Sequence, residues 1–437
     1  MPVPDSQTQG WAPSCCSVRP SCPHREENIW TRSTLTGDWG GLRTRLQERG
    51  LTFGGTVTQF GFGLEGGINS PRIPPALGQG DTSKYTGRGE YTLTLDLEKF
   101  GGLPKGSLYI AAQHWWGDFG NVSLNTGAIP PTVFPALLPP VPNDEGRPYI
   151  TDFLLTQPLS QNLVVFVGKK NVIGVADQDD FAGGNGTNEF MNQALIANPA
   201  FLLALPYSSF TAGMVSPQRW GAIAAFVMDP QDRTQEFFRV NDLFSQGVIV
   251  AGEVKLKTYF FSLPGHHHVV CLWNHLDLTI LAFDEPPPGQ YPYQSVAGSP
   301  TLRDSYTIYY GFDQYLQVYC EETKRGWGLF GRASISDANP TPLRYFLSFG
   351  VGGYTPFRQD KGDQFGIGWY FVGASDEFGP RPRAIFGPRD GYGIELFYNF
   401  QITPWMSLTP DFQIIKPDAG AIAKMGYIGG LRLNLKF

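Results

Sequence analysis

The sequence has few charged residues, and no part of it is strongly basic. Asp, Glu, Lys and Arg together make up 16% of the 437 residues, and the formal net charge is −6. Proteins that grip nucleic-acid phosphates need clustered Lys and Arg side chains. We therefore expect no nucleic-acid partner.

Long apolar runs are also missing. No run approaches the ~18 residues that a membrane-spanning helix needs, and the mean hydropathy is −0.19. The missing runs argue against transmembrane helices. The average resembles that of a soluble protein, but it is also compatible with a transmembrane β-barrel. In such a barrel, lipid-facing apolar residues alternate with polar residues that face the lumen.

Cysteine is scarce and irregularly placed. Cys15, Cys16 and Cys22 lie in a Pro- and Ser-rich N-terminal stretch, whereas Cys271 and Cys320 lie far apart in strand-like runs. An odd number without regular spacing predicts neither a disulfide framework nor a zinc site. The first twenty residues also lack a basic region followed by an apolar region, so no signal peptide is recognisable there.

Catalytic signatures are absent as well. The chain contains no GxSxG or HExxH motif. Three consecutive histidines, His266 to His268, fall in a predicted short turn that begins with Pro264 and Gly265. Consecutive strand residues point to opposite faces, so all three do not easily share one ion. We expect no enzyme activity, no catalytic residues, no cofactor and no metal.

What the sequence does contain is turn residues, aromatics and alternation. There are 53 Gly and 36 Pro, and aromatics reach 14%, which favours an all-β fold. Period-2 alternation recurs in residues 88–100, 247–257, 326–336 and 406–415. We predict about sixteen strands that start near residues 51, 86, 107, 148, 162, 209, 219, 247, 267, 305, 326, 344, 363, 391, 406 and 427.

The connections between these segments are sorted by length. Short ones, such as residues 98–106 and 262–266, alternate with mostly long ones: 64–85, 117–147, 171–208, 229–246, 282–304 and 374–390. Short turns at one end and long loops at the other are typical of an antiparallel outer-membrane barrel. The sequence contains no repeat of the length of a propeller blade, which argues against a soluble β-propeller.

The two ends of the chain fit this interpretation. The last residues, GGLRLNLKF, alternate up to Phe437, and this strand must pair with the first because lipid cannot satisfy an open edge. Residues 35–50 predict a short amphipathic helix capped by Asp38, with Gly50 after its end. We therefore divide the chain into a leader (1–34), a short periplasmic helix (35–50) and a barrel (51–437).

Several stretches resemble the carbohydrate-selective porins of the OprB family. They are LTGDWGGLRTRLQERGLTF (35–53), MNQALIANPAF (191–201), LPGHH (263–267), ELFYNFQITPWMSLTPDFQIIKP (395–417) and the terminal GLRLNLKF. The resemblance implies a sixteen-stranded outer-membrane barrel, monomeric or homotrimeric, through which small carbohydrates diffuse. It also implies contact with outer-membrane lipid and recognition of the terminal Phe by the barrel-assembly machinery.

Strand parity selects candidate lumen residues. A pore that prefers sugars needs hydrogen-bonding groups and an aromatic surface. The candidates for pore lining or substrate binding are Arg88, Glu90, Asp96, Trp115, Glu253, Lys255, Asp313, Arg332, Glu395, Asp411, Gln413 and Arg432. Their mixed signs suit a neutral polyol better than an ion.

Arg88 and Glu90 are the candidates for a constriction, because they share one face of one strand near a long loop. The plainer alternative is that they form ordinary ion pairs of the barrel wall. The loop at 171–208, which carries Asp177, Asp179 and Asp180, either folds into the pore or covers its mouth. Trp115 has lumen parity, whereas Trp116, Trp220, Trp405 and Tyr427 suit an interfacial aromatic girdle.

The sequence alone leaves the preferred solute open. A sugar-preferring porin with a mixed-charge lumen is the first hypothesis. A general or anion-preferring porin differs from it in pore width, which the sequence does not encode locally. A barrel that only anchors the outer membrane and conducts nothing is the third hypothesis.

Overall fold

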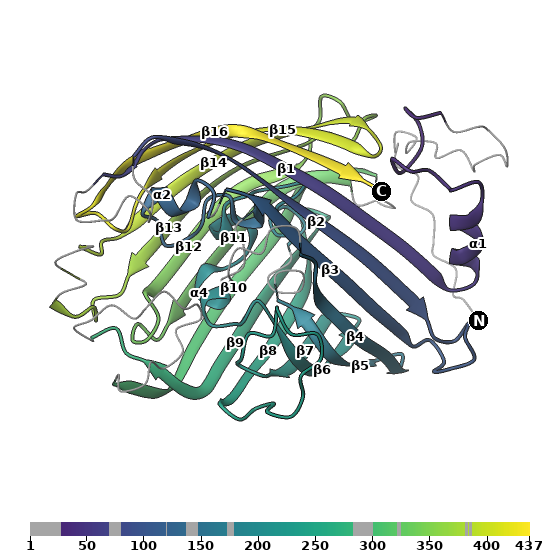
Figure 1. Cartoon of the computed structure of the whole chain (residues 1–437), viewed down its shortest axis with the longest axis horizontal. Helices are drawn as coiled ribbons and strands as arrows, with labels where there is room; N and C mark the ends of the chain where they lie inside the picture. Colours follow the sequence, from purple (N-terminus) through teal and green to yellow (C-terminus); the bar gives the residue numbers. More distant parts are fainter. Residues whose placement is uncertain are drawn as a thin grey trace.

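The chain folds into one closed barrel in the computed structural model. The structure describes residues 28–69, 80–118, 120–136, 147–172, 179–282, 300–320, 325–380, 383 and 387–437. Within them, sixteen antiparallel strands pair in sequence order, and β16 closes on β1 (Figure 1). This confirms the predicted fold class. Most of the predicted leader, residues 1–27, lies outside the described residues.

The strand boundaries follow the predicted starts closely. Four strands, β2, β9, β10 and β16, begin four residues before their predicted starts. The strands are β1 Leu51–Ile68, β2 Thr82–Asp96, β3 Ser107–Gly117, β4 Tyr149–Ser160, β5 Leu163–Asn171, β6 Ser208–Gln218, β7 Gly221–Met228, β8 Gly247–Phe260, β9 Leu263–Thr279, β10 Thr301–Cys320, β11 Arg325–Ser336, β12 Leu343–Tyr354, β13 Gln364–Ala374, β14 Gly391–Thr403, β15 Met406–Lys416 and β16 Ala423–Lys436.

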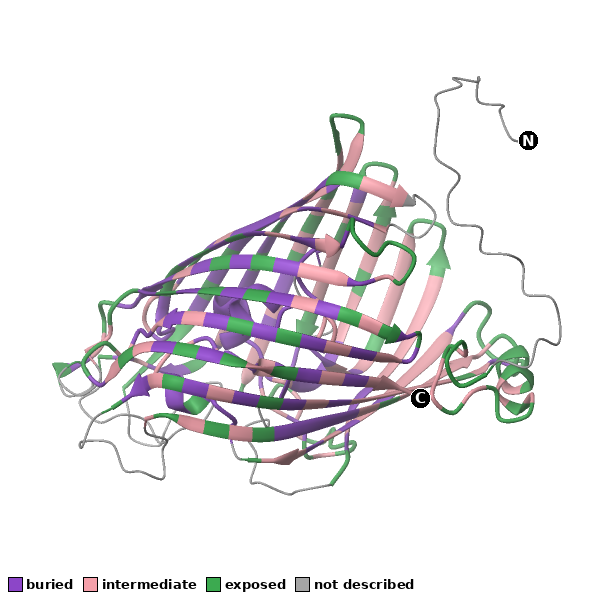
Figure 2. Ribbon diagram, turned by 90° about the horizontal axis from the view of Figure 1, so that it is seen from above, coloured by how far each residue is buried: buried purple, intermediate pink, exposed green. Residues whose placement is uncertain are grey.

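Alternation along the strands separates an outer apolar face from an inner face. In Figure 2 the buried and exposed residues alternate along most strands. On β16, Leu431 is exposed while its neighbour Arg432 is buried, and on β15 the same holds for Phe412 and Gln413. The exposed residues are apolar, as on the outer face of a transmembrane barrel, and their neighbours point inward.

One hairpin differs from its prediction. The β8–β9 turn consists of Phe261 and Ser262, whose φ angles are 56° and 62°. Two central residues with positive φ match the twist of a tight hairpin. Pro264, Gly265 and the three histidines therefore lie inside β9, so their predicted place in the turn was wrong.

The last residues of the chain meet Leu35 and the first strand at the short-turn end of the barrel. The amide of Phe437 donates to the carbonyl of Gly55 at 2.8 Å, and that of Leu35 donates to Lys436 at 2.7 Å. Helix α1, Leu42–Glu48, lies beside them (Figure 1). Arg43 of this helix donates to the carbonyls of Phe53 and Phe437. The N-terminal helix thus secures the seam between the first and last strands.

Helix α1 begins later than Asp38 predicts. Its N-cap is Gly41, but the Asp38 carboxylate still accepts from the amide of Thr44 at 2.8 Å. Gly50 follows the helix with a φ of 93°, as expected of a C-terminal glycine. No described helix has the length and apolar character needed to cross a membrane.

Two long loops carry short helices into the barrel. The β3–β4 loop contains α2 (Ser123–Thr126) and η2 (Phe134–Ala136), and the β5–β6 loop contains α3 (Gln193–Ile196) and α4 (Pro199–Leu203). The side chains of Asn192 and Asn198 cap α3 and α4. Figure 1 shows α2 and α4 enclosed by strands. The largest hydrophobic cluster combines this second loop with inward-facing residues of the barrel.

Candidate functional site

The described part of the β5–β6 loop, residues 179–207, is held inside the barrel by charged wall residues. Glu395 accepts from the amides of Met191 and Asn192 at 2.6 and 2.9 Å. Arg332 donates to the carbonyls of Leu195 and Ala182 at 2.9 and 3.0 Å. These contacts resolve the alternative that the sequence left open, because the loop folds into the pore.

Glycines in the wall make room for this loop. A Cβ atom added to Gly366 would lie 2.6 Å from the ring of Phe190, and one added to Gly368 would lie 2.7 Å from Leu195. Neither separation is tolerable for carbon atoms in contact. Gly366 and Gly368 of β13 therefore form a surface without side chains, the glycine bed, against which the apolar side of the loop packs.

Arg432 anchors the same loop from β16. Its guanidinium donates to the carbonyls of Gly186 and Glu189 at 2.7 and 2.6 Å. Burial raises the pKa of the Glu189 carboxyl to about 7, and the nearby Arg432 opposes this shift. A carboxyl that is half neutral at physiological pH thus lies within the docked loop.

The β3–β4 loop packs beside it. The amide of Gln193 donates to Pro131 at 2.9 Å, and the side chain of Gln413 donates to Thr132 at 2.9 Å. Asp418, between β15 and β16, accepts from the amide of Ile129 at 2.8 Å. Burial raises the pKa of Asp418 to about 7. The two loops therefore support each other over one side of the lumen.

Five of the predicted site residues lie beneath these loops. They face the interior, are at most 5% exposed, and form hydrogen bonds with the loops or with one another: Arg332, Glu395, Asp411, Gln413 and Arg432. Four of them anchor the loops directly, and Asp411 accepts from the Gln413 side chain at 3.0 Å. A direct role toward a substrate stays a prediction for all of them.

Arg88 and Glu90 lie on β2, which is separated from β16 by β1 alone. Arg88 Nη1 donates to the carbonyl of Asn185 in the inserted loop at 3.4 Å. The Arg88 side chain is 3% exposed and its Nη2 lies 2.6 Å from Glu90 Oε2, whereas Glu90 is 21% exposed. Gln113 of β3 also donates to Glu90 Oε2, at 2.7 Å. Arg88 therefore holds and neutralises Glu90, and Glu90 is the more accessible member of the pair.

Aromatic residues extend this cluster. The hydroxyl of Tyr207 donates to Gln113 Oε1 at 2.7 Å, and its ring meets Trp115 edge-to-face with centroids 5.9 Å apart. Burial raises the pKa of Tyr207 to about 12, so the hydroxyl stays protonated. Trp115 faces inward as its parity predicts, but it is only 4% exposed. It therefore supports Tyr207 and offers little free surface of its own.

Gln113 and Tyr207 were absent from the predicted set. Gln113 lies two residues before Trp115 and shares its parity, so the sequence contained a signal for it. Tyr207 lies in the inserted loop, just before β6, and no alternation marks it.

A cavity of about 300 Å³ lies between α4 and the barrel wall beside this cluster. Phe201 and Leu205 line it on the loop side, and Lys170 and Glu253 line it on the wall side. Lys170 Nζ lies 2.9 Å from Asp152 Oδ1. Charges of opposite sign are thus paired along the part of the lumen that the loop leaves open.

The remaining predicted residues have separate surroundings. Asp96 lies at the short-turn end, where its carboxylate accepts from the amide of Glu98 at 3.2 Å and caps the turn. Asp313 is fully buried and 2.9 Å from the Nδ1 atom of His266. Glu253 lies 3.1 Å from His268. Lys255 faces the lumen next to Glu253 on β8 and is partly exposed.

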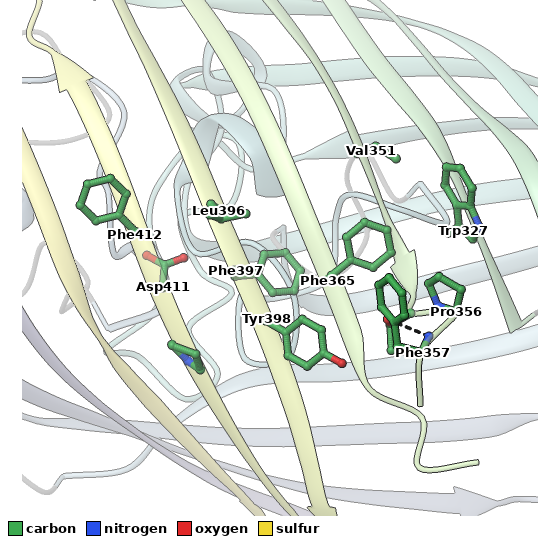
Figure 3. A pocket seen from close by; sticks show the side chains of 12 residues that line it. Trp327, Val351, Pro356, Phe357, Phe365, Leu396, Phe397, Tyr398, Asp411 and Phe412 are labelled. Atoms are coloured by element: carbon green, nitrogen blue, oxygen red, sulfur yellow. Dashed lines mark hydrogen bonds between the residues drawn. The ribbon is translucent and has the colours of Figure 1, made fainter. Parts of the chain in front are cut away.

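A larger hollow lies on the outer surface. It has a volume of about 560 Å³ and is bordered by Trp327, Phe357, Leu396 and Phe412, among other apolar residues (Figure 3). Leu396 and Phe412 are cross-strand partners and are 47% and 45% exposed. The hollow therefore belongs to the lipid-facing surface and lies outside the solute path.

A closed sixteen-strand barrel narrowed by an inserted loop is the architecture of an outer-membrane diffusion channel. The family description "Carbohydrate-selective porin, OprB family" matches residues 81–437 of this chain. The chain belongs to this family, which confirms the resemblance seen in the sequence. The family and the fold are those of a channel in the outer membrane.

Solved structures share the fold. The high-pH structure of Pseudomonas putida OprB has a TM-score of 0.76 and 18% identity, and covers 93% of this chain and 99% of its own. The low-pH structure of the same protein has a TM-score of 0.55 and 14% identity over the same shares. The channel DcaP of Acinetobacter baumannii has a TM-score of 0.51 and 11% identity, covering 89% and 97%. Comparison with curated proteins gives no significant sequence match.

Proposed function

We propose that this porin lets mono- and small oligosaccharides diffuse passively along the wall that the inserted loop leaves open. The observation that carries the proposal is the cluster that Arg88, Glu90 and Gln113 of that wall form with Tyr207 at the end of the inserted loop. Its members are fixed by mutual hydrogen bonds of 2.6 to 2.7 Å. It combines a neutralised carboxylate, an amide and an aromatic hydroxyl.

Such groups suit a sugar because they exchange its hydration shell for hydrogen bonds without imposing a net charge. Tyr207 adds an apolar ring beside these polar groups, which matches the alternation of hydroxyls and C–H faces on a pyranose. The pairing of Lys170 with Asp152 keeps the adjacent wall balanced in charge. A lumen lined with one sign would instead attract ions of the opposite sign.

The test is single-channel conductance of the refolded protein in a planar bilayer, titrated with glucose and with a disaccharide. We expect a low conductance that falls saturably as sugar is added. Arg88→Ala should weaken the block by about fivefold, because one hydrogen-bonded contact contributes about 1 kcal/mol. It should also raise cation conductance, since Glu90 then loses its counter-charge.

The matched control is Arg344→Ala. Arg344 forms an ion pair of 2.7 Å with Asp376, but both side chains are more than half exposed. This variant should conduct and be blocked like the wild type. Equal sugar block in the Arg88 and Arg344 variants would contradict the assignment of the site.

The same recordings separate the alternatives. A large ohmic conductance that sugar does not change would identify a general porin, and a reversal potential that follows chloride would identify an anion-preferring one. Verified folded protein without any channels would support an anchor.

The proposed partners follow from the same placement: outer-membrane lipid around the apolar face, the barrel-assembly machinery during insertion, and either no other copy or two further copies in a homotrimer.

Phe437→Asp should lower the amount of inserted barrel several-fold, because it places a charge on the closing strand. Phe261→Asp, at a side chain 93% exposed in the β8–β9 turn, is the control. Normal insertion of the Phe437 variant would remove the terminal residue as a recognition signal.

A further inference from the structure

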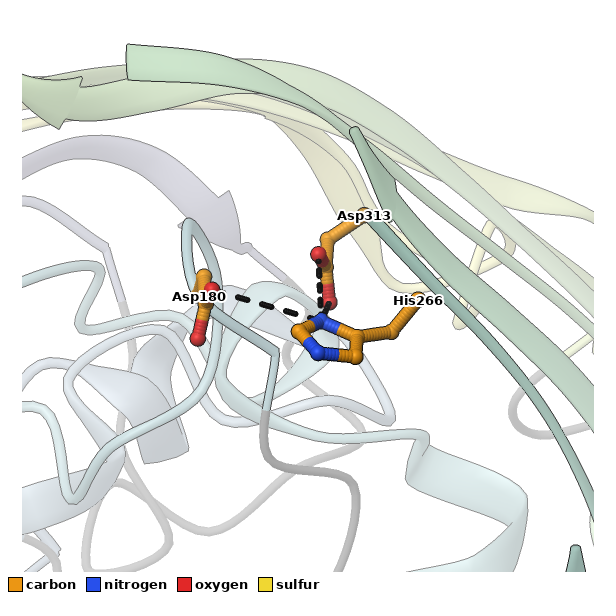
Figure 4. A group of neighbouring side chains, drawn as sticks. All are labelled: Asp180, His266 and Asp313. Carbon is orange, nitrogen blue, oxygen red and sulfur yellow. Dashed lines mark hydrogen bonds and ion pairs between the residues drawn. The ribbon is translucent and has the colours of Figure 1, made fainter. Parts of the chain in front are cut away.

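Three ligand-type side chains meet between the inserted loop and the wall. His266 of β9 and Asp313 of β10 face the lumen, and Asp180 reaches them from the loop (Figure 4). The His266 Nδ1 atom lies 2.9 Å from Asp313 Oδ1 and 4.0 Å from Asp180 Oδ2. One ligand atom from each residue lies within 4.8 Å of the other two.

These separations fit the coordination shell of a metal ion. In a tetrahedral zinc shell with bonds of about 2.0–2.2 Å, ligand atoms lie about 3.4 Å apart. This value falls between the 2.9 and 4.0 Å that separate the His266 Nδ1 atom from Asp313 and Asp180. The three residues come from three separate segments of the chain, so an ion bound here would link the loop to β9 and β10. Water molecules would complete it from the lumen.

The charges also call for a cation. Asp313 is fully buried, and Asp180 Oδ2 is inaccessible to solvent and receives no hydrogen bond from the residues that the structure describes. One protonated histidine balances only one of the two carboxylates. A divalent cation balances both, and it supplies the partner that Asp180 Oδ2 lacks.

Neighbouring residues fix the loop at this point. Asp179, next to Asp180, lies 3.1 Å from Arg332 Nη2 and 3.4 Å from His268 Nε2. His268 in turn lies 3.1 Å from Glu253. The backbone that carries Asp180 is therefore held in register with β9 before any metal binds, which reduces the entropy cost of forming the site.

We propose that Asp180, His266 and Asp313 bind a divalent transition metal of the zinc class, which clamps the inserted loop to the barrel wall. An imidazole nitrogen with two carboxylate oxygens suits zinc, whereas calcium and magnesium take oxygen ligands almost throughout. This site departs from the expectation from sequence that the chain binds no metal. The clamp acts on the loop and is independent of which solute passes the opposite wall.

The test is titration of the full-length, detergent-folded protein with Zn²⁺ by calorimetry, after alkylation of its five cysteines. Alkylation removes thiol ligands elsewhere in the chain. We expect that Asp180→Asn abolishes one zinc per chain or weakens its binding at least tenfold, since an anionic ligand is lost. Saturating Zn²⁺ should raise the melting temperature of the wild type but not of this variant.

His267→Gln is the matched control. His267 is the next residue of β9, but it points to the opposite face and contacts Tyr310. This variant should bind zinc like the wild type, whereas His266→Gln should not. Asp180 belongs to the loop and is partly exposed, so its variant keeps the test decisive even where His266→Gln does not fold.

Two results would overturn the proposal. One is equal zinc affinity and stoichiometry in the wild type and Asp180→Asn. The other is absence of zinc binding in the alkylated wild type at millimolar Zn²⁺, which would reduce the cluster to an ion pair between His266 and its two carboxylates.

Discussion

The two sides of the lumen wall differ in what their inward-facing residues contact. On the covered wall, formed by β11 to β16, charged residues bind the backbone of the inserted loops, as Arg332, Glu395 and Arg432 do. On the open wall, formed by β2 to β8, charged residues also pair with one another, as Arg88 does with Glu90 and Lys170 with Asp152. Arg88 has in addition one longer contact with the loop, to the carbonyl of Asn185 at 3.4 Å. The outer faces of the two walls show the same alternation.

This difference separates two uses of a buried charge. A guanidinium that donates to several loop carbonyls satisfies groups that would otherwise be buried without partners, and so it sets the width of the pore. A guanidinium paired with one partly exposed carboxylate leaves that carboxylate available to a solute. We therefore propose that identical residue types serve structure on one wall and selectivity on the other.

The largest effect is expected from filling the glycine bed of the covered wall. Gly368→Leu places a side chain where Leu195 now lies 2.7 Å from the Cβ position, so the loop must move away. Because the loop occupies much of the lumen, we expect single-channel conductance to rise several-fold and sugar block to disappear. Bilayer recordings measure both.

Gly61→Leu is the control for this substitution. A Cβ atom on Gly61 meets nothing within 4 Å, and Gly61 pairs with the lipid-facing Leu431 on β16. Its conductance should equal that of the wild type. A Gly368 variant that conducts like this control would show that the loop does not limit the pore.

A smaller effect is expected from Arg332→Ala. The substitution leaves the carbonyls of Leu195 and Ala182 without their donor, at a cost of about 1–3 kcal/mol for each buried group. We expect looser docking of the loop and a roughly twofold rise in conductance. Sugar affinity should change less than in Arg88→Ala, so the two arginines test the two walls directly. The reverse ranking would mean that the walls have exchanged roles.

The outer face of the barrel could be predicted from the sequence because the membrane imposes it locally. Each strand must alternate where it crosses lipid, so residues such as Leu431 and Arg432 reveal their faces without knowledge of the rest of the chain. The prediction of strand boundaries was poorer at the strand ends, where the membrane no longer imposes alternation. β2, β10 and β16 begin four residues early at the long-loop end, and the β8–β9 turn lies at Phe261 and Ser262.

The division of the lumen into two walls could not be predicted in the same way. It depends on contacts between Arg332 and loop residues 136 or more positions away, and alternation carries no information about such contacts. One signal was present in the glycines with inward parity, including Gly366 and Gly368. Their meaning becomes clear only once Phe190 and Leu195 are seen above them.

The smallest effect is expected from pH, and it concerns the covered wall alone. Burial raises the pKa of Glu189 from its ordinary value to about 7, so the docked loop favours the neutral carboxyl. A raised carboxyl pKa means that the docked loop is most stable below about pH 4.5 and loses stability as pH rises to about 7. Asp418, whose pKa burial also raises to about 7, acts in the same direction on the neighbouring loop.

Conductance should therefore increase modestly between pH 4.5 and pH 7.5, and Glu189→Gln should flatten part of this rise because glutamine does not titrate. Glu377→Gln, at an exposed residue outside both loops, should keep the full rise. Hydrogen exchange of residues 186–196 should follow the same pH dependence, since it reports loop opening directly. A rise that survives in the Glu189 variant and vanishes in Asp418→Asn would assign the pH response to the β3–β4 loop. In that case Asp418, whose carboxylate accepts from the amide of Ile129, would control how firmly the covered wall holds its loops. Glu189, beside Arg432, would not.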